Sequence, residues 1–128
     1  MYDPLLDAAL PAAGFSGRSM DLGLTDKVAI VTGSSRGLGL ASARALAVEG
    51  CRVVMCARGA DRLDAAAAEV RAIGGADRVL AVRADVSSES GAASVVEGAV
   101  ARFGGLDILV NNVGLAKGGD VLSTTDAE

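Results

Sequence analysis

The sequence contains no histidine and no tryptophan, and it holds only one tyrosine, two phenylalanines and two cysteines. A zinc site would therefore have to be built from carboxylates alone, which is an unusual ligand set for zinc. No stretch approaches the roughly eighteen apolar residues that span a bilayer, and residues 1–19 lack the basic and hydrophobic regions of a signal peptide. These absences predict a cytoplasmic protein without a metal centre or a membrane contact.

Positive charge is also scarce. The 12 Lys and Arg residues are outnumbered by 16 Asp and Glu residues, which gives a net charge of -4. A general nucleic-acid binder needs a basic surface that neutralises phosphates, and no short segment here is rich in lysine or arginine. The charge pattern therefore excludes nucleic acid as the expected partner.

Apolar residues make up 51% of the chain and are mostly alanine, valine and leucine, which suits helices that alternate with buried parallel strands. Cys51 and Cys56 lie around one of these expected strands, at a spacing that points their side chains to opposite faces. We therefore expect two core thiols rather than a disulfide.

Continuous apolar runs at 27–32, 52–57, 78–84 and 106–112 predict four strands. Between the runs, apolar spacing predicts three helices, which Gly50 and Gly74 can end and a serine can begin. The expected inward faces are Leu38, Ala41, Ala45 and Val48 in the first helix, Leu63, Ala66, Ala67 and Val70 in the second, and Val95, Val96, Ala99 and Phe103 in the third.

This alternation predicts an α/β fold with a doubly wound parallel sheet of Rossmann type and helices on both faces. The 128 residues suffice for one domain with a core of its own. Residues 1–19 hold both prolines and show no clear period, so we expect a loose amino-terminal extension there. Residues 20–128 are expected to form the domain itself.

The stretch VTGSSRGLG, residues 31–39, lies between an apolar run and an alanine-rich helix. A strand that turns at once into a helix aims unpaired backbone N–H groups, and the positive end of the helix dipole, at one point. Glycines at 33, 37 and 39 therefore predict a phosphate cradle. The alternative is that these glycines only permit a tight turn.

Three motifs follow one another at the expected strand ends. They are T-G-x-x-x-G-x-G over 32–39, D-V over 85–86, and N-N-V-G over 111–114. In these motifs the chain resembles the short-chain dehydrogenase/reductase family over residues 24–128, and its 3-oxoacyl-carrier-protein reductases in particular. Val113 stands where the family has alanine, and we expect this exchange to be tolerated.

The resemblance implies a strand order of 3-2-1-4 and hydride transfer between a nicotinamide dinucleotide and a carbonyl or alcohol. It implies that residues 20–128 form an incomplete, NAD(P)-binding Rossmann half-domain, truncated before the catalytic segment. It also implies a homo-oligomer for the full-length form. It also implies the residues that contact the dinucleotide. These are Gly33, Ser35, Arg36, Gly37, Leu38, Gly39, Arg58, Asp85, Val86, Asn112 and Gly114. In the family the residue at Asp85 bonds the adenine amino group, but Asp85 could instead only start the turn into the third helix. Asn111 is expected to tie neighbouring strands through its amide.

Two other classes of nucleotide-binding site lack residues that they require. A nucleoside-triphosphate P-loop requires G-K-[ST], whereas Leu40 and Ala41 follow Gly39 and no lysine is near. A methyltransferase-like site typically has an acid at the end of the second strand, where Ala57 stands. A nicotinamide dinucleotide is therefore the favoured ligand.

Two arginines bear on which dinucleotide binds. An acid about twenty residues past the glycines favours NAD, whereas an arginine favours the 2'-phosphate of NADP. Arg36 in the glycine turn and Arg58 after the second strand can flank one phosphate. The sequence therefore favours NADP(H), with NAD as the alternative. In the other interpretation Arg58 is a solvated charge that pairs with Asp61 or Asp64.

The family's catalytic pattern Y-x-x-x-K does not occur in the 128 residues. The only tyrosine is Tyr2, and the only lysines are Lys27 and Lys117. We therefore expect no catalytic residue and no activity in this chain alone. One hypothesis is that the chain is the cofactor-binding portion of a truncated oxidoreductase; the other is a non-catalytic nucleotide-binding module that a partner chain completes.

The last residues favour truncation, because Thr125 and Glu128 are spaced as in a capping box and indicate a helix that does not follow. The fourth strand, in LDILV, would then lie at an open sheet edge. Unpaired backbone groups at such an edge favour aggregation or pairing with another chain.

Overall fold

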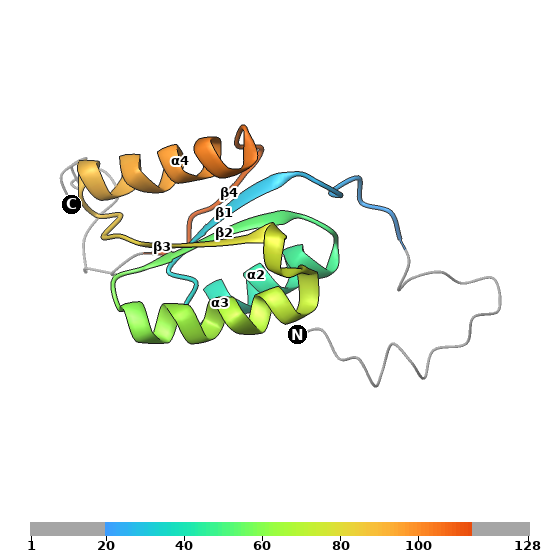
Figure 1. The fold of residues 1–128 in the computed structure, drawn as a ribbon, viewed down its shortest axis with the longest axis horizontal. Helices are drawn as coiled ribbons and strands as arrows, with labels where there is room; N and C mark the ends of the chain where they lie inside the picture. The colour runs from blue at the N-terminus through green and yellow to red at the C-terminus, as the bar shows by residue number, and fades with distance from the viewer. Residues whose placement is uncertain (1–19, 114–128) are drawn as a thin grey trace, which may run out of the picture.

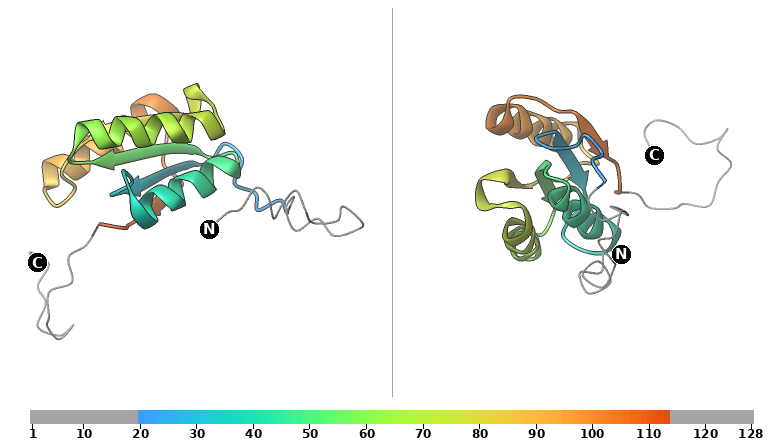
Figure 2. Two further views of the ribbon diagram at one scale, coloured as in Figure 1. Left: turned by 90° about the horizontal axis from the view of Figure 1, so that it is seen from below. Right: turned by 90° about the vertical axis from the view of Figure 1, so that its right-hand side faces the viewer.

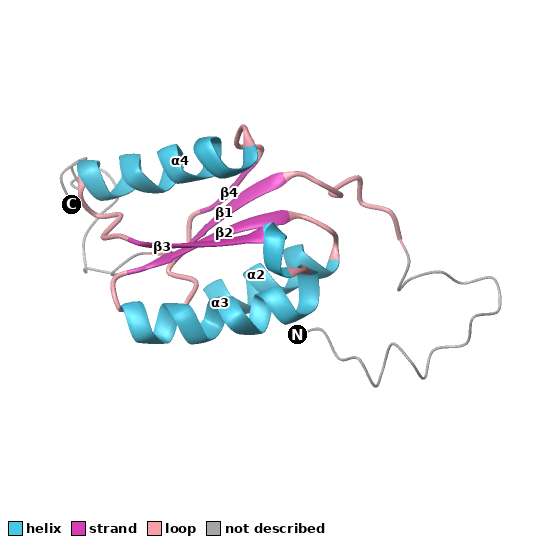
Figure 3. Cartoon of the chain, in the orientation of Figure 1, coloured by secondary structure: helices cyan, strands magenta, loops and turns pink. Residues whose placement is uncertain are grey.

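The computed structural model describes residues 20–113 (Figure 1). Strands and helices alternate as the sequence predicts (Figure 3), and the short 3-10 helix η2 (Ala76–Arg78) is an addition that periodicity did not indicate. The elements are β1 (Val28–Thr32), α2 (Gly37–Val48), β2 (Arg52–Ala57), α3 (Ala60–Gly74), β3 (Val79–Arg83), α4 (Glu89–Phe103) and β4 (Ile108–Val110). The expected extension over 1–19, Gly114 and the capping box at Thr125 and Glu128 lie outside the described residues.

The strands form one parallel sheet in the order β3-β2-β1-β4, which confirms the order that the resemblance implied. In register, Ile30 of β1 lies between Val54 of β2 and Leu109 of β4. Helix α4 covers one face of the sheet, and α2 and α3 cover the other (Figures 1 and 2). In the described part of the sheet β4 is an edge strand, and Leu109 is 59% exposed. Its pairing with another chain stays a prediction.

Most apolar side chains of the strands pack into one of two apolar clusters, one on each face of the sheet. Val53 and Met55 face α2 and α3, whereas Val54 faces α4. Cys51 belongs to the first cluster and Cys56 to the second, and both are free thiols. Burial raises the pKa of both thiols, so they are held in the protonated, unreactive form. The expectation of two core thiols on opposite faces is confirmed.

The predicted inward face of α2 is wrong. Leu38 and Val48 are 78% and 43% exposed, and Ala45 is exposed too. The residues of α2 that are buried are Gly39, Ala43 and Ala47. Alanine and leucine occur on every side of this helix, so spacing could not choose a face. The sheet contacts the row of small residues, because these let the helix backbone approach closely.

The inward face of α3 is confirmed, since Leu63, Ala66, Ala67 and Val70 are all buried. In α4, Val95 and Ala99 are buried, but Val96 is 43% exposed and does not face inward as predicted. The reason is the position of Val96 on the flank of α4, beside a cavity next to the short edge strand β4.

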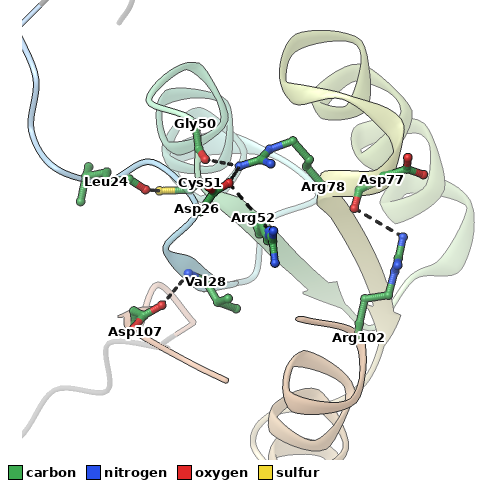
Figure 4. Close-up of polar contacts among 10 residues, drawn as sticks. All are labelled: Leu24, Asp26, Val28, Gly50, Cys51, Arg52, Asp77, Arg78, Arg102 and Asp107. Carbon is green, nitrogen blue, oxygen red and sulfur yellow. Dashed lines mark hydrogen bonds and ion pairs between the residues drawn. The ribbon is translucent and has the colours of Figure 1, made fainter. Parts of the chain in front are cut away.

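Polar contacts hold the amino ends of the strands together (Figure 4). Arg78 donates hydrogen bonds to the carboxylate of Asp26 at 2.6 Å and to the carbonyl of Gly50 at 2.5 Å, and Arg52 lies 4.0 Å from the same carboxylate. The hydrogen bond and the positive charge of Arg78 lower the pKa of Asp26. On the other side, the Asp107 carboxylate accepts the first N–H of β1 at 2.9 Å. This edge is thus occupied by structural contacts.

Candidate functional site

The turn between β1 and α2, at the carboxyl edge of the sheet, presents a row of unpaired backbone N–H groups. Gly33 and Gly37 have φ angles of +59° and +58°, which favour glycine and let α2 start directly beyond β1. Within residues 20–113, none of the N–H groups of Ser35, Arg36, Gly37, Leu38 and Gly39 has an acceptor in good hydrogen-bond geometry. These donors and the positive end of the α2 dipole favour an anion at this point.

Gly39 is the point of closest approach within the turn. A Cβ atom there would overlap the carbonyl oxygen of Gly33 and lie 2.8 Å from Nδ2 of Asn112. A Cβ atom at Gly37 would meet nothing within 4 Å, so that side of the turn is open. Gly39 is therefore required for packing, whereas Gly37 leaves space beside the free N–H groups.

The buried hydroxyl of Thr32 fastens the tip of β4 to the glycine turn. It accepts hydrogen bonds from the N–H groups of Asn112 at 2.8 Å and Val113 at 3.2 Å, and it donates to the carbonyl of Val110 at 3.4 Å. The amide of Asn112 also donates to the carbonyl of Gly33 at 3.4 Å. The first and third motifs therefore form a single structural unit.

Ser34 fastens the same turn to the end of β2. Its hydroxyl accepts the N–H of Cys56 at 3.1 Å, and its own N–H donates to the carbonyl of Cys56, also at 3.1 Å. Ser34 is fully buried. Sequence reasoning assigned a contact to Ser35 and none to Ser34 or Thr32. The adjacent serines give no signal that separates them, because the choice depends on the register with β2.

Arg36 and Arg58 stand exposed beside this turn and at the end of β2. Neither forms an ion pair with any of residues 20–113. The interpretation in which Arg58 pairs with Asp61 or Asp64 is therefore not what this part of the structure shows. Two guanidinium groups remain available at the site.

Asp85 starts the turn into α4. Its Oδ1 accepts the N–H of Ser87 at 3.0 Å and the hydroxyl of Ser87 at 2.6 Å. These hydrogen bonds, and to a smaller extent the charge of Arg58, lower the pKa of Asp85. Ser88 bonds the Asp85 carbonyl and caps α4 by accepting the N–H of Gly91 at 3.0 Å. Oδ2 of Asp85 has no hydrogen bond to the described residues, so the adenine contact stays a prediction beside the structural role.

A cavity of about 230 Å³ lies at the same edge, between α4 and the strands β1 and β4. Its wall is mostly apolar and is formed by Ile30, Thr32, Val86, Ala92, Val95, Val96, Leu109 and Asn111. Val86 thus lines the cavity together with Thr32, and its contact with the dinucleotide stays a prediction. Asn111 lines this cavity, and the amide that ties neighbouring strands belongs to Asn112 instead.

Residues 20–113 contain no cluster of three or more His, Cys, Asp or Glu residues placed to hold a metal ion. They also contain no helix with the length and apolar character needed to cross a bilayer.

Residues 27–128 match the protein family described as short chain dehydrogenase. The chain belongs to this family. Membership agrees with the three motifs, whose described residues the fold brings to one edge of the sheet. It favours the oxidoreductase hypothesis over a non-catalytic module.

Relatives in the family include an uncharacterized oxidoreductase of Mycobacterium tuberculosis, 44% identical over 102 residues, which are 80% of this chain and 38% of that protein. L-sorbose reductase from Gluconobacter frateurii, solved with NADPH and L-sorbose, is 45% identical, with a TM-score of 0.73. The alignment covers 84% of this chain and 40% of the reductase chain. A variant of actinorhodin polyketide ketoreductase, solved with NADPH, is 39% identical, with a TM-score of 0.67. The alignment covers 79% of this chain and 38% of the ketoreductase chain. The chain thus spans about two fifths of each relative.

Proposed function

We propose that this chain is the NADP(H)-binding portion of an oxidoreductase that transfers hydride between a nicotinamide cofactor and a carbonyl or alcohol substrate. The observation that carries the proposal is the row of free N–H groups in the glycine turn, with the unpaired guanidinium groups of Arg36 and Arg58 nearby. The end of β2 carries Ala57 rather than an acid, so no carboxylate at that position repels a 2'-phosphate.

Different residues of the chain bind different parts of the dinucleotide. The free backbone N–H groups of Ser35, Gly37, Leu38 and Gly39 bind the pyrophosphate, and Gly33 gives the turn the conformation that frees them. Arg36 and Arg58 hold the 2'-phosphate by charge-assisted hydrogen bonds. Asp85 and Val86 face the adenine, and Asn112 and Gly114 form the wall of the adenosine ribose. The nicotinamide ring, when bound, supplies the hydride donor or acceptor.

Two neighbours in the family support NADP(H) over the alternative, NAD. L-sorbose reductase and actinorhodin polyketide ketoreductase were both solved with NADPH. The two act on a sugar and on a polyketide by their names, so they support a carbonyl or alcohol substrate only as a broad class. A homo-oligomer for a longer form of the protein remains part of the proposal.

The test is a titration of the 128-residue chain with 2',5'-ADP and with 5'-ADP. Each well-formed charge-assisted hydrogen bond is worth about 1.5–3 kcal/mol, so we expect at least about tenfold tighter binding of 2',5'-ADP. Arg58→Asp should narrow or invert this preference, because it removes a cation and adds a repulsive charge. Lys27→Asp makes the same charge change at the other end of β1 and should leave the preference intact.

Equal affinities for the two nucleotides, unchanged by Arg58→Asp, would show that Arg36 and Arg58 are surface charges that do not contact the nucleotide. Failure of both nucleotides to bind, with the chain folded, would exclude a dinucleotide site altogether.

A further inference from the structure

A third arginine lies at the same edge of the sheet. Arg83 is the last residue of β3 and lies opposite Ala57 in the parallel register. Its Nε donates a hydrogen bond to the carbonyl oxygen of Arg58 at 3.1 Å. The residue is exposed and forms no ion pair with any of residues 20–113. Arg83 lies outside the three sequence motifs and is not among the residues proposed above to bind phosphate.

The bond matters because the backbone at Arg58 has little other support. The hydrogen bonds between β2 and β3 end one residue earlier, where the N–H of Ala84 donates to the carbonyl of Ala57 at 3.0 Å. Helix α3 begins only at Ala60, and its N-cap, Gly59, has no side chain that could bond the turn. A Cβ atom at Gly59 would meet nothing within 4 Å. Among the described residues, Arg83 is therefore the only hydrogen-bond donor to the Arg58 carbonyl.

We propose that Arg83 is a positioning residue that fixes the peptide after Arg58, and that it thereby sets the preference for nucleotides with a 2'-phosphate. The carbonyls on either side are already held, that of Ala57 by Ala84 and that of Gly59 by the N–H of Leu63 at 3.1 Å, so the peptide between Arg58 and Gly59 is the unit that depends on Arg83. The direction of the Arg58 side chain follows from this peptide, which the exposed glycine next to it would otherwise leave free to rotate. A fixed turn holds the Arg58 guanidinium near the glycine turn before the nucleotide arrives. The inference rests on the proposed function, and it assigns the effect of Arg83 to the hydrogen bond rather than to its charge.

Two substitutions separate the hydrogen bond from the charge. In Arg83→Gln, the amide nitrogen occupies the place of Nε in the covalent chain, so the donor is kept while the charge is lost. In Arg83→Met, a side chain of similar length has neither donor nor charge. The readout is the ratio of the dissociation constants of 5'-ADP and 2',5'-ADP, measured on the 128-residue chain.

We expect Arg83→Met to lower this ratio by about threefold to tenfold, which is the value of one hydrogen bond, and to change 5'-ADP binding by less than about twofold. Arg83→Gln should keep the ratio within about twofold of the unmodified chain. Backbone hydrogen exchange over residues 59–63 should become faster in Arg83→Met and not in Arg83→Gln.

An equal loss in both variants would overturn the inference, since it would mean that Arg83 acts through its charge. An unchanged ratio or unchanged exchange in Arg83→Met would overturn it as well. The proposed cofactor is tested separately by the unmodified chain. If that chain shows no preference for 2',5'-ADP, the choice of NADP(H) fails and this inference fails with it, whereas a preference that survives Arg83→Met removes only this inference.

Discussion

Gly39 lies where α2 packs against the turn from which it starts, and this contact gives a prediction at the scale of one residue. Gly39→Ala places a methyl group onto the carbonyl of Gly33, so the turn must move. We expect a loss of about 1–3 kcal/mol in the free energy of unfolding, and loss of 2',5'-ADP binding. Denaturant titration and nucleotide titration measure the two effects.

Gly98→Ala is the matched control for this substitution. A Cβ atom at Gly98, within α4, would make ordinary contacts of 3.4 Å with Val82 and 3.5 Å with Leu80. Alanine is a better helix former by up to about 1 kcal/mol, so this variant should be as stable as the unmodified chain or more stable. A Gly39→Ala chain that binds nucleotide like the control would contradict the close-packing account.

The sequence predicted Gly33 and Gly37 well, because backbone conformation sets their identity, with φ angles of +59° and +58°. Gly39 was predicted from the spacing of the same motif, whereas in the structure close packing against the carbonyl of Gly33 requires it. Thr32 and Ser34 could not be assigned in the same way, because their partners are 80 and 22 residues away along the chain. A buried hydroxyl has no local pattern, and only the assembled sheet shows what it bonds.

The loop before β1 gives a prediction at the scale of elements. Asp26 has φ +63°, in the left-handed region that Asn and Asp tolerate, and it accepts a hydrogen bond from Arg78 just before β3. Because the pKa of Asp26 is lowered in the folded chain, its contribution to stability is present above the ordinary value of about 3.9 and is lost as the pH falls through the folded value.

Asp26→Asn should therefore destabilise the chain at neutral pH and give a flatter decline of stability on acidification. Thermal unfolding at several pH values between about 2 and 7 measures both effects. Glu97→Gln, at an exposed position of α4 without an ion pair in the described structure, is the control. Identical acid profiles for Asp26→Asn and the unmodified chain would show that the Arg78 contact is not maintained in solution.

The kinds of element and their order were predictable, since apolar runs and helical spacing alternate without ambiguity. The inward face of α2 was not, because an alanine-rich helix offers similar side chains in every direction. In α4, Val95 and Ala99 were placed correctly, whereas Val96 was not. Its exposure depends on how far the sheet extends beyond β1, which periodicity within α4 does not encode.

At the scale of the whole molecule, the 128-residue chain should reduce no ketone and oxidise no alcohol with either nicotinamide cofactor. Its sequence contains no Y-x-x-x-K to supply the proton that accompanies hydride transfer. Nicotinamide absorbance in the presence of several carbonyl and alcohol substrates measures turnover directly. Steady turnover by a pure sample, lost in Gly37→Asp, would contradict this expectation.

The contacts of Thr32 also set when the nucleotide site can exist during synthesis. The Thr32 hydroxyl forms hydrogen bonds with backbone groups that lie 78 to 81 residues further along the chain. The ribosome must therefore have synthesised β4 before the turn can be complete. Strands β1 to β3 can assemble before β4 is present. Until β4 docks, however, the Thr32 hydroxyl and the Gly33 carbonyl lack their hydrogen bonds to residues 110–113. Closing so long a loop is a late event in folding. A nascent chain should therefore acquire nucleotide binding in a single step, when β4 docks beside β1.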